Sequence, residues 1–326
     1  MIKIDGVNLS VGYTEDEIKE KCAKKLKISS KSIVFYEIIK LSLDARRKND
    51  IKYNANIALS LNEKLEDKYK SLKYEIDKRG LEYYPKKTNF SPIVVGFGPS
   101  GIFAGLALAR MGLKPIIIEQ GKCVEERQKD VEEFWNKGKL NKYSNVQFGE
   151  GGAGTFSDGK LNSNISNTYT KKVINELYNF GAPKEITYLS KPHIGSDNLR
   201  KIVKNIRQEI INLGGKVLFS HKMVDISIKN DKLTGITIKN LLDDNEEHLQ
   251  TNHLLLCLGH SARDSFEMLY SKNLNIKQKP FAMGVRIEQS QNEINERQYG
   301  KDYDKRLPPA DYKLVVHLPN GRNVFT

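Results

Sequence analysis

Residues 93–105 read IVVGFGPSGIFAG, and this stretch carries the strongest structural signal in the chain. An apolar run typical of a buried strand leads into Gly96, Gly98 and Gly101, and an apolar helical segment follows. Gly96 permits a tight turn, Gly98 lets the backbone approach a phosphate, and Gly101 lets the helix pack closely on the strand. Because the first amides of a helix attract anions, the stretch predicts a dinucleotide turn built from Gly96, Gly98, Pro99, Ser100 and Gly101.

A second apolar strand, KPIIIEQ, ends in an acidic residue about 20 positions after the middle glycine, which is where dinucleotide folds place the acid that bonds a ribose hydroxyl. Glu119 is therefore the expected ribose ligand, with Gln120 beside it. Arg127 follows within the next segment. It fits a contact with a phosphate or with the adenine side of the cofactor, and it equally fits an ion pair on a helix surface.

A second match to the same glycine spacing occurs in QFGEGGAGTFSDGKL, residues 147–161. The residues before it are too polar for a buried strand, and Ser, Asp and Gly stand where a helix would begin, so it is not a second dinucleotide turn. Its five glycines nevertheless allow close approach to a ligand or unusual backbone angles. The alternative is a flexible surface loop. The expected cofactor contacts in this segment are Gly152, Gly154, Thr155, Ser157 and Asp158.

Composition restricts the class of protein. The chain has 326 residues, 39% of them hydrophobic, which is enough for two domains with buried cores. A net charge of +13 suits nucleic-acid binding, but lysine far outnumbers arginine, which favours a solvated basic surface. Three dispersed cysteines predict a reducing, cytoplasmic location, and no apolar segment is long enough to span a membrane.

The cofactor is expected to be FAD rather than NAD. After Glu119 the chain does not continue into further strand–helix units. It runs through the long glycine-rich segment and two helices, then through KVLFSHKMVDISIKN, KLTGITIKN and HLQTNHLLLCLG, which indicate three strands of a β-meander. This order is typical of FAD domains of the glutathione-reductase-like class.

Five blocks narrow the resemblance: VVGFGPSGIFAGLALARMG, SNVQFGEGGAGTFSDGKLN, KPHIGSDNL, CLGHSARDSFEML and KPFAMGVRIE. Together they resemble the bacterial FAD-dependent dehydrogenase family, from about residue 40 to the end. The resemblance implies FAD, an oxidoreductase activity and a small extra N-terminal domain. Within the wider class it also implies that Gly259, at a strand end, lies near the cofactor and that Met223 binds adenine through its main chain. It implies no particular substrate.

The expected fold class is α/β, with a Rossmann-like FAD-binding domain and β-meander, a small α+β domain before it and a partial β-rich substrate domain. The N-terminal domain covers 1–88, with strands near 1–4, 32–43 and 51–61, a helix capped by Thr14 and another helix over 62–80. The FAD domain covers 89–165 and 197–275. The substrate domain covers 166–196 and 276–326.

The C-terminal residues depart from the family pattern. DYKLVVHLPNGRNVFT predicts a hairpin with its turn at Pro319, Asn320 and Gly321, and no Gly-Asp return to the flavin follows Gly259. We therefore expect the sequence to be part of a longer one, with an unpaired strand edge and an incomplete pocket for the flavin ring.

Only one dinucleotide fold is indicated, so electrons come from a substrate, from NAD(P)H that docks transiently, or from a partner protein. We expect hydride transfer at the flavin with a nicotinamide donor. Weak candidates for catalysis are His193, Asp197, His260 and Arg286. The alternatives are an N-cap role for Ser196 or Asp197, a helix start at His260 and a cross-strand ion pair for Arg286.

Lys160 could place a positive charge near a reduced flavin, or it could be an ordinary surface lysine. The histidines show no paired spacing typical of a metal site. Two other functions stay open: RNA binding through the basic N-terminal module, which contains DARRKND, and reduction of a lipid by the flavoprotein. The sequence leaves the oligomeric state undetermined.

Overall fold

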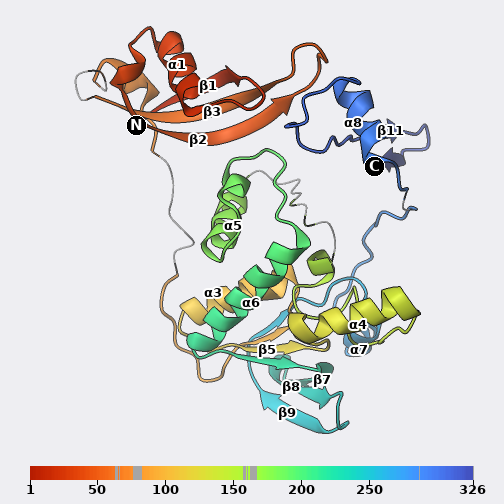
Figure 1. Cartoon of the computed structure of the whole chain (residues 1–326). Helices are drawn as coiled ribbons and strands as arrows, with labels where there is room; N and C mark the ends of the chain where they lie inside the picture. The colour runs from red at the N-terminus through yellow and green to blue at the C-terminus, as the bar shows by residue number, and fades with distance from the viewer. Residues whose placement is uncertain are drawn as a thin grey trace. The chain divides into compact units, whose positions relative to one another are not determined.

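The computed structural model describes residues 1–326 apart from 63–64, 66, 76–82, 157–158, 160, 162–166, 286 and 326 (Figure 1). The chain forms two compact units. The first comprises Met1–Asp77, Thr187–Ser190 and Pro280–Thr326, and the second comprises Lys78–Ile186 and Lys191–Lys279. The expected three-domain division stays a prediction; the structure groups residues 280–326 with the N-terminal residues.

The N-terminal part of the first unit is a three-stranded antiparallel sheet with a helix packed on it. Its strands, in the order β1-β3-β2, are β1 (Ile2–Leu9), β2 (Ile33–Asp44) and β3 (Lys52–Leu61), and its helix is α1 (Glu15–Leu26). Ile57 and Leu59 of the middle strand are fully buried together with Cys22 of the helix. The hydroxyl of Thr14 accepts a hydrogen bond from the amide of Glu17, which confirms Thr14 as the N-cap of α1.

The prediction of a helix over residues 62–80 is wrong for residues 67–74. Asp67–Leu72 forms a 3-10 helix, and Lys73 makes an isolated antiparallel bridge to Ile2. The amide of Tyr74 donates to the carbonyl of Met1 at 2.8 Å. The edge strand β1 offers backbone groups that a longer helix could not satisfy, so pairing with this edge overrides local helix propensity.

Residues 280–326 contribute α8 (Gln291–Tyr299) and a hairpin of β11 (Val315–His317) and β12 (Asn323–Phe325). Tyr299 and Leu307 are buried against Val11 and Ile51 of the N-terminal part. The hairpin turn lies where the sequence predicted it, with Gly321 at φ +78°. Among the described residues β11 and β12 pair only with each other. A cross-strand ion pair for Arg286 would need a strand over FAMGVRIE, residues 281–288, and the described residues of that stretch form none; Val285 is 87% exposed.

The second unit is built on a four-stranded parallel sheet in the order β10-β4-β5-β6. The strands are β4 (Ile93–Val95), β5 (Ile116–Glu119), β6 (Lys216–Phe219) and β10 (Leu254–Leu256). The helices are α3 (Pro99–Arg110), α4 (Val124–Lys137), α5 (Thr168–Asn179), α6 (Ser196–Asn212) and α7 (Arg263–Ser271). This is the expected α/β fold, with strand, helix and strand following one another from residue 93.

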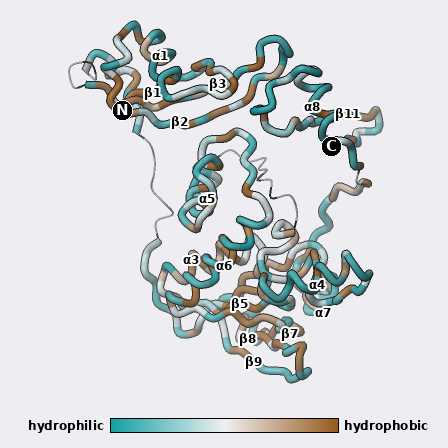
Figure 2. Tube along the Cα trace, viewed as in Figure 1, coloured by the Kyte–Doolittle hydropathy of each residue, from teal (hydrophilic) through white to brown (hydrophobic). Residues whose placement is uncertain are grey.

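Both faces of the parallel sheet are covered, and successive strand residues point to opposite faces. Val94 and Ile117 are buried with side chains of α3 and α6, whereas Ile93, Val95 and Ile118 are buried against the meander and α7. Figure 2 shows the apolar residues along β5 and in the adjoining meander. Burial on both faces explains why β4 and β5 have continuous apolar sequences rather than alternating ones.

The expected three-strand meander is divided between two sheets. The meander itself is β7 (His221–Lys229), β8 (Lys232–Asn240) and β9 (Glu246–Gln250). KVLF and LLL, which were expected to be continuous with the first and last meander strands, are β6 and β10 of the parallel sheet. Ser220, at φ +56°, separates β6 from β7, because a left-handed residue ends the extended run.

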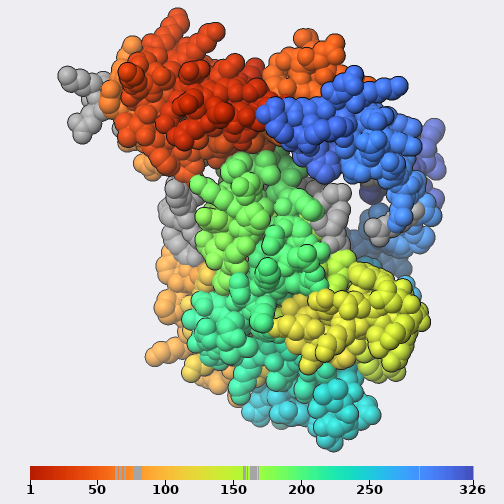
Figure 3. All heavy atoms as spheres, viewed as in Figure 1, coloured from red at the N-terminus to blue at the C-terminus, as the bar shows by residue number. Residues whose placement is uncertain are grey.

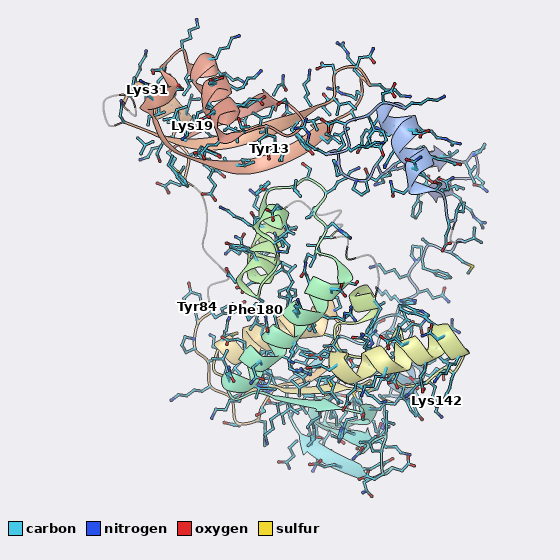
Figure 4. All side chains as sticks on the ribbon, in the orientation of Figure 1. Tyr13, Lys19, Lys31, Tyr84, Lys142 and Phe180 are labelled. Carbon is cyan, nitrogen blue, oxygen red and sulfur yellow. The ribbon has the colours of Figure 1, made fainter. Side chains whose placement is uncertain are left out.

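The helix α5 is joined to α3 by a buried ion pair. Glu176, 2% exposed, accepts from Arg110 at 2.6 Å, and the Arg110 guanidinium lies 5.8 Å from the ring of Phe180, which is labelled in Figure 4. Burial of one carboxylate beside one guanidinium makes this pair sensitive to the loss of either partner.

Candidate cofactor site

The turn after β4, residues 96–101 and hereafter the dinucleotide turn, contains two glycines that the packing requires. Gly96 has φ +98°, and a Cβ on it would lie 2.3 Å from the carbonyl oxygen of Cys257, which follows β10. A Cβ on Gly101 would lie 1.8 Å from the carbonyl oxygen of Gly96. These distances are far shorter than a van der Waals contact, so neither position has room for a side chain. The tight turn expected at Gly96 and the close helix packing expected at Gly101 are both present.

Gly98 differs from its two neighbours in the motif. It is the N-cap of α3 with φ −76°, and a Cβ on it would meet only the Cα of Gly152, at 3.7 Å. Pro99 occupies the first turn of the helix, where a missing amide hydrogen does no harm. The protein itself therefore tolerates a methyl group at position 98. A phosphate that approaches this backbone would explain why the residue is glycine.

Glu119, at the end of β5, is aimed at the dinucleotide turn. Its carboxylate is 5% exposed and accepts from the amide of Phe97 at 2.7 Å and from the amide of Gly121 at 2.9 Å. A carboxylate has about four acceptor positions, so the group retains capacity for a further donor. Its contact with a ribose stays a prediction. Gln120 lies half-buried next to it.

The second glycine-rich segment, residues 144–155 and hereafter the glycine loop, lies against the dinucleotide turn. The amide of Gly151 donates to the carbonyl of Phe97 at 2.9 Å, and a Cβ on Gly152 would lie 3.2 Å from the Cα of Gly98. A Cβ on Gly121 would lie 2.5 Å from the Cα of Gly149. The second triplet is therefore no separate dinucleotide turn, as expected: its glycines let the loop pack on the first.

Two side-chain oxygens in the glycine loop have no hydrogen-bond partner, one on Glu150 and one on Thr155. Thr155 is fully buried, and its hydroxyl oxygen makes no hydrogen bond. A Cβ on Gly151 would lie 2.0 Å from that oxygen. A Cβ on Gly154, in contrast, would have no atom within 4 Å.

Arg127 is buried rather than on a helix surface, which corrects one of the two expected alternatives. Four hydrogen bonds run from its guanidinium to carbonyl oxygens of the glycine loop. Burial lowers the pKa of Arg127 to about 10, while the nearby Glu119 and Glu150 oppose that shift. The group therefore stays charged at neutral pH. A contact with a phosphate or with adenine stays a prediction.

Glu150 is a buried acid that the sequence did not single out. One carboxylate oxygen accepts from the amide of Val124 at 2.7 Å and from Arg207 at 3.0 Å, and the other has no hydrogen-bond partner. Burial raises the pKa of Glu150 to about 7. Arg207 also pairs with Glu125 at 2.6 Å, where α4 and α6 lie side by side (Figure 3). The only signal in the sequence was a single charge within a run of glycines.

The weaker candidates are more exposed. His193 and Asp197 are exposed near the start of α6, and Asp197 pairs with Arg200 three residues later. The N-cap of α6 is Gly195 and it has no side-chain cap, so the alternative of an N-cap role for Ser196 or Asp197 is wrong. His260 is exposed next to Gly259, which has φ +69°.

Two further residues expected to bind the cofactor, Ser100 and Met223, lie within the second unit, and their contacts with FAD stay predictions. The hydroxyl of Ser100 donates to the sulfur of Cys257 at 3.4 Å, which ties the turn to the chain that follows β10. Met223 is 2% exposed in the core under the meander, and its contact with adenine stays a prediction. The expected roles of Ser157, Asp158, Lys160 and Arg286 fall on residues outside those that the structure describes.

The described residues contain no group of three or more His, Cys, Asp or Glu side chains placed to hold a metal ion. Within the same residues, no helix combines the length and the apolar character needed to cross a membrane.

A parallel sheet with a glycine turn after one strand and an acid at the end of the next defines a Rossmann-like dinucleotide-binding fold. Residues 280–326 match the family described as "FAD-dependent protein, C-terminal domain-like", and residues 1–60 match a domain of unknown function, DUF8436. The match at 280–326 confirms the resemblance to FAD-dependent proteins that the sequence indicated.

The chain is 44% identical over 321 residues to an uncharacterized protein of Clostridium beijerinckii. The alignment covers 96% of this chain and 59% of that protein, so the chain spans about three fifths of the relative's length.

Solved structures with a similar arrangement include THI4 of Thermovibrio ammonificans, with a TM-score of 0.39 and 15% identity over 57% of this chain and 63% of that one. Another is the glycerol-3-phosphate dehydrogenase of Bacillus halodurans complexed with FAD, with a TM-score of 0.35 and 12% identity over 56% of this chain and 36% of that one.

Proposed function

We propose that the chain binds FAD between the dinucleotide turn and the glycine loop, and that the protein is an FAD-dependent oxidoreductase. The observation that carries the proposal is the bond from the Phe97 amide to Glu119, which holds the expected ribose ligand beside the turn expected to hold the pyrophosphate. The family match at residues 280–326 supports FAD as the dinucleotide.

In this proposal the protein's own groups bind and orient the cofactor. The first amides of α3, beyond Gly98, have no partners within the helix and point toward the pyrophosphate. The spare acceptor positions of Glu119 take the ribose hydroxyls, and backbone groups of the glycine loop form the opposite wall. When bound, FAD supplies the group that accepts a hydride.

We further propose that the hydride donor is a nicotinamide that docks transiently and leaves oxidised. The supporting observation is that the second glycine triplet, at Gly149, Gly151 and Gly154, packs on the first site and does not form a second nucleotide fold. Substrate identity, in this proposal, depends on residues beyond the dinucleotide turn.

The hairpin of β2 and β3, whose turn contains DARRKND, gives no support to RNA binding. Arg46 pairs with Asp44 at 2.7 Å, and Lys52 pairs with Asp50 at 2.5 Å, so two of its cations are already neutralised by neighbours. Phosphate binding requires cations that are free to replace counterions. The lipid-directed reductase stays a prediction without a specific observation in its favour.

The test is to mix purified chain with FAD, remove free cofactor by gel filtration and measure the flavin absorbance that remains with the protein. Flavin that stays with the protein after gel filtration supports the proposal. If a titration of the protein with FAD also shows no binding, the proposal is overturned. The loaded protein is then reduced anaerobically with NADH and with NADPH in separate experiments. If FAD binds but neither donor bleaches it, the donor proposal fails while the FAD proposal stands.

A further inference from the structure

Arg127 is the largest of the fully buried side chains among the described residues. Its Nε donates to the carbonyl of Asn145 at 2.8 Å, and its Nη2 donates to the carbonyl of Val146 at 3.0 Å. Its Nη1 donates to the carbonyls of Glu150 at 2.6 Å and Gly152 at 3.0 Å. One side chain from α4 therefore satisfies main-chain acceptors at both ends of the glycine loop.

The glycine loop is held by individual hydrogen bonds rather than by a helix or a strand: the side chain of Asn145 accepts from the amides of Gln147 and Phe148, and the amide of Gly151 donates to the carbonyl of Phe97. From residue 144 to residue 152 it has no helix or strand, and Gly149, Gly151 and Gly152 all have positive φ. Glycines lose more conformational freedom than any other residue when they are ordered, so the ordered loop needs strong contacts elsewhere. Buried carbonyls also require donors. The planar fork of a guanidinium offers several donors in fixed directions, which a lysine cannot reproduce.

The surroundings of the guanidinium are suited to a buried cation. It lies 4.8 Å from the centre of the Phe156 ring, and a Cβ on Gly149 would lie 2.4 Å from the Arg127 side chain. Two buried acids, Glu119 and Glu150, interact electrostatically with it. A buried charge is costly unless hydrogen bonds and opposite charges compensate for the lost water; here four carbonyls accept from the guanidinium and the two acids attract it.

We propose that Arg127 is a positioning residue: it shapes the glycine loop into the second wall of the cofactor cradle before the cofactor binds. The inference rests on the proposed function and concerns the part of that site opposite Glu119. Glu119 is held by Phe97 and Gly121, independently of the loop carbonyls that Arg127 binds. Loss of Arg127 therefore weakens the binding of FAD, which needs both walls, much more than the binding of ADP, which needs the turn and Glu119.

The experiment compares wild type with Arg127→Met and Arg127→Lys by titration with FAD and with ADP. Arg263→Met, an exposed arginine of α7 in the same unit, is the matched control. We expect the FAD dissociation constant to rise at least tenfold for Arg127→Met and by a smaller factor for Arg127→Lys, with ADP changed less than threefold and the control unchanged. Methylguanidinium, added below denaturing concentration to Arg127→Ala, should recover part of the FAD affinity.

A readout without cofactor comes from Trp135, the one tryptophan in the sequence. Its ring lies edge-on to Phe156, the residue directly after the glycine loop, with centroids 6.4 Å apart, so its emission reports the position of this end of the loop. We expect a changed emission in Arg127→Met before any FAD is added. Arg127→Lys keeps the buried charge and provides the test if Arg127→Met fails to fold.

An FAD affinity within threefold of wild type in folded Arg127→Met and Arg127→Lys overturns the inference. An equal loss of FAD and ADP binding overturns it too, because Arg127 would then support the whole fold. If wild type binds neither FAD nor ADP, the proposed function fails instead, and the emission of Trp135 still reports whether Arg127 shapes the loop.

Discussion

Replacing Gly98 with alanine separates binding from folding at the dinucleotide turn. The backbone of Gly98 has φ −76°, which alanine adopts without strain, and the added Cβ would meet only the Cα of Gly152 at an ordinary 3.7 Å. Gly→Ala stabilises a protein by about 0.4–1 kcal/mol through the unfolded chain. Alanine is also a poorer N-cap than glycine, which opposes this gain. The free energy of unfolding should therefore change by less than about 1 kcal/mol.

The same methyl group occupies the space through which a pyrophosphate would approach the backbone. Forcing an extra carbon into a filled contact costs about 1–3 kcal/mol. Since about 1.4 kcal/mol corresponds to a tenfold change in affinity, the dissociation constant for FAD should rise about fivefold to about 150-fold.

The assay is a pair of measurements on one preparation: urea unfolding without cofactor and titration with FAD. Gly284→Ala is the control, because no atom lies within 4 Å of its Cβ position and it belongs to the first unit. Unchanged FAD affinity in a stable Gly98→Ala protein would refute the placement of the pyrophosphate at Gly98. A large loss of stability would show that the glycine serves packing instead.

Three further substitutions test the same site. Gly101→Ala should lower the free energy of unfolding by at least about 1–3 kcal/mol in urea, because its methyl group would lie 1.8 Å from a backbone oxygen; a stability equal to wild type would contradict the packing. Glu119→Gln should lower the free energy of unfolding by about 1–3 kcal/mol and weaken FAD binding, because the NH2 group of the new amide would face one of the two backbone amides that now donate to the carboxylate; a neutral result in both assays would exclude the carboxylate from the turn. Glu150→Gln should remove a pH dependence. Folding raises the pKa of Glu150 from 4.5 to about 7, so this residue's contribution to stability is greatest below about pH 4.5 and falls by up to about 1.4 kcal/mol per unit as the pH rises toward 7. Urea unfolding of wild type and variant across this range should give converging or crossing curves, and parallel curves would rule out the raised pKa.

Local signals in the sequence were sufficient for the dinucleotide turn and its surroundings. The apolar run at Ile93–Val95, the glycines at 96 and 101 and the acid at 119 lie where the spacing predicted, because each depends on contacts between adjacent elements. The hairpin turn at Gly321 depends likewise on a few neighbouring residues. Strand period, glycine geometry and capping act over a few residues, so a single sequence reveals them.

Long-range packing decided the rest. Nothing near Arg127 indicates that it binds carbonyls between residues 145 and 152, and nothing near Arg207 indicates a bond to Glu150. Sequence patterns likewise could not assign β6 and β10 to the parallel sheet. They also could not show that Lys73 pairs with Ile2 where a helix was expected. Partners of buried charges and strand neighbours are chosen by which surfaces meet after folding, and residues far apart in the chain carry no local trace of that choice.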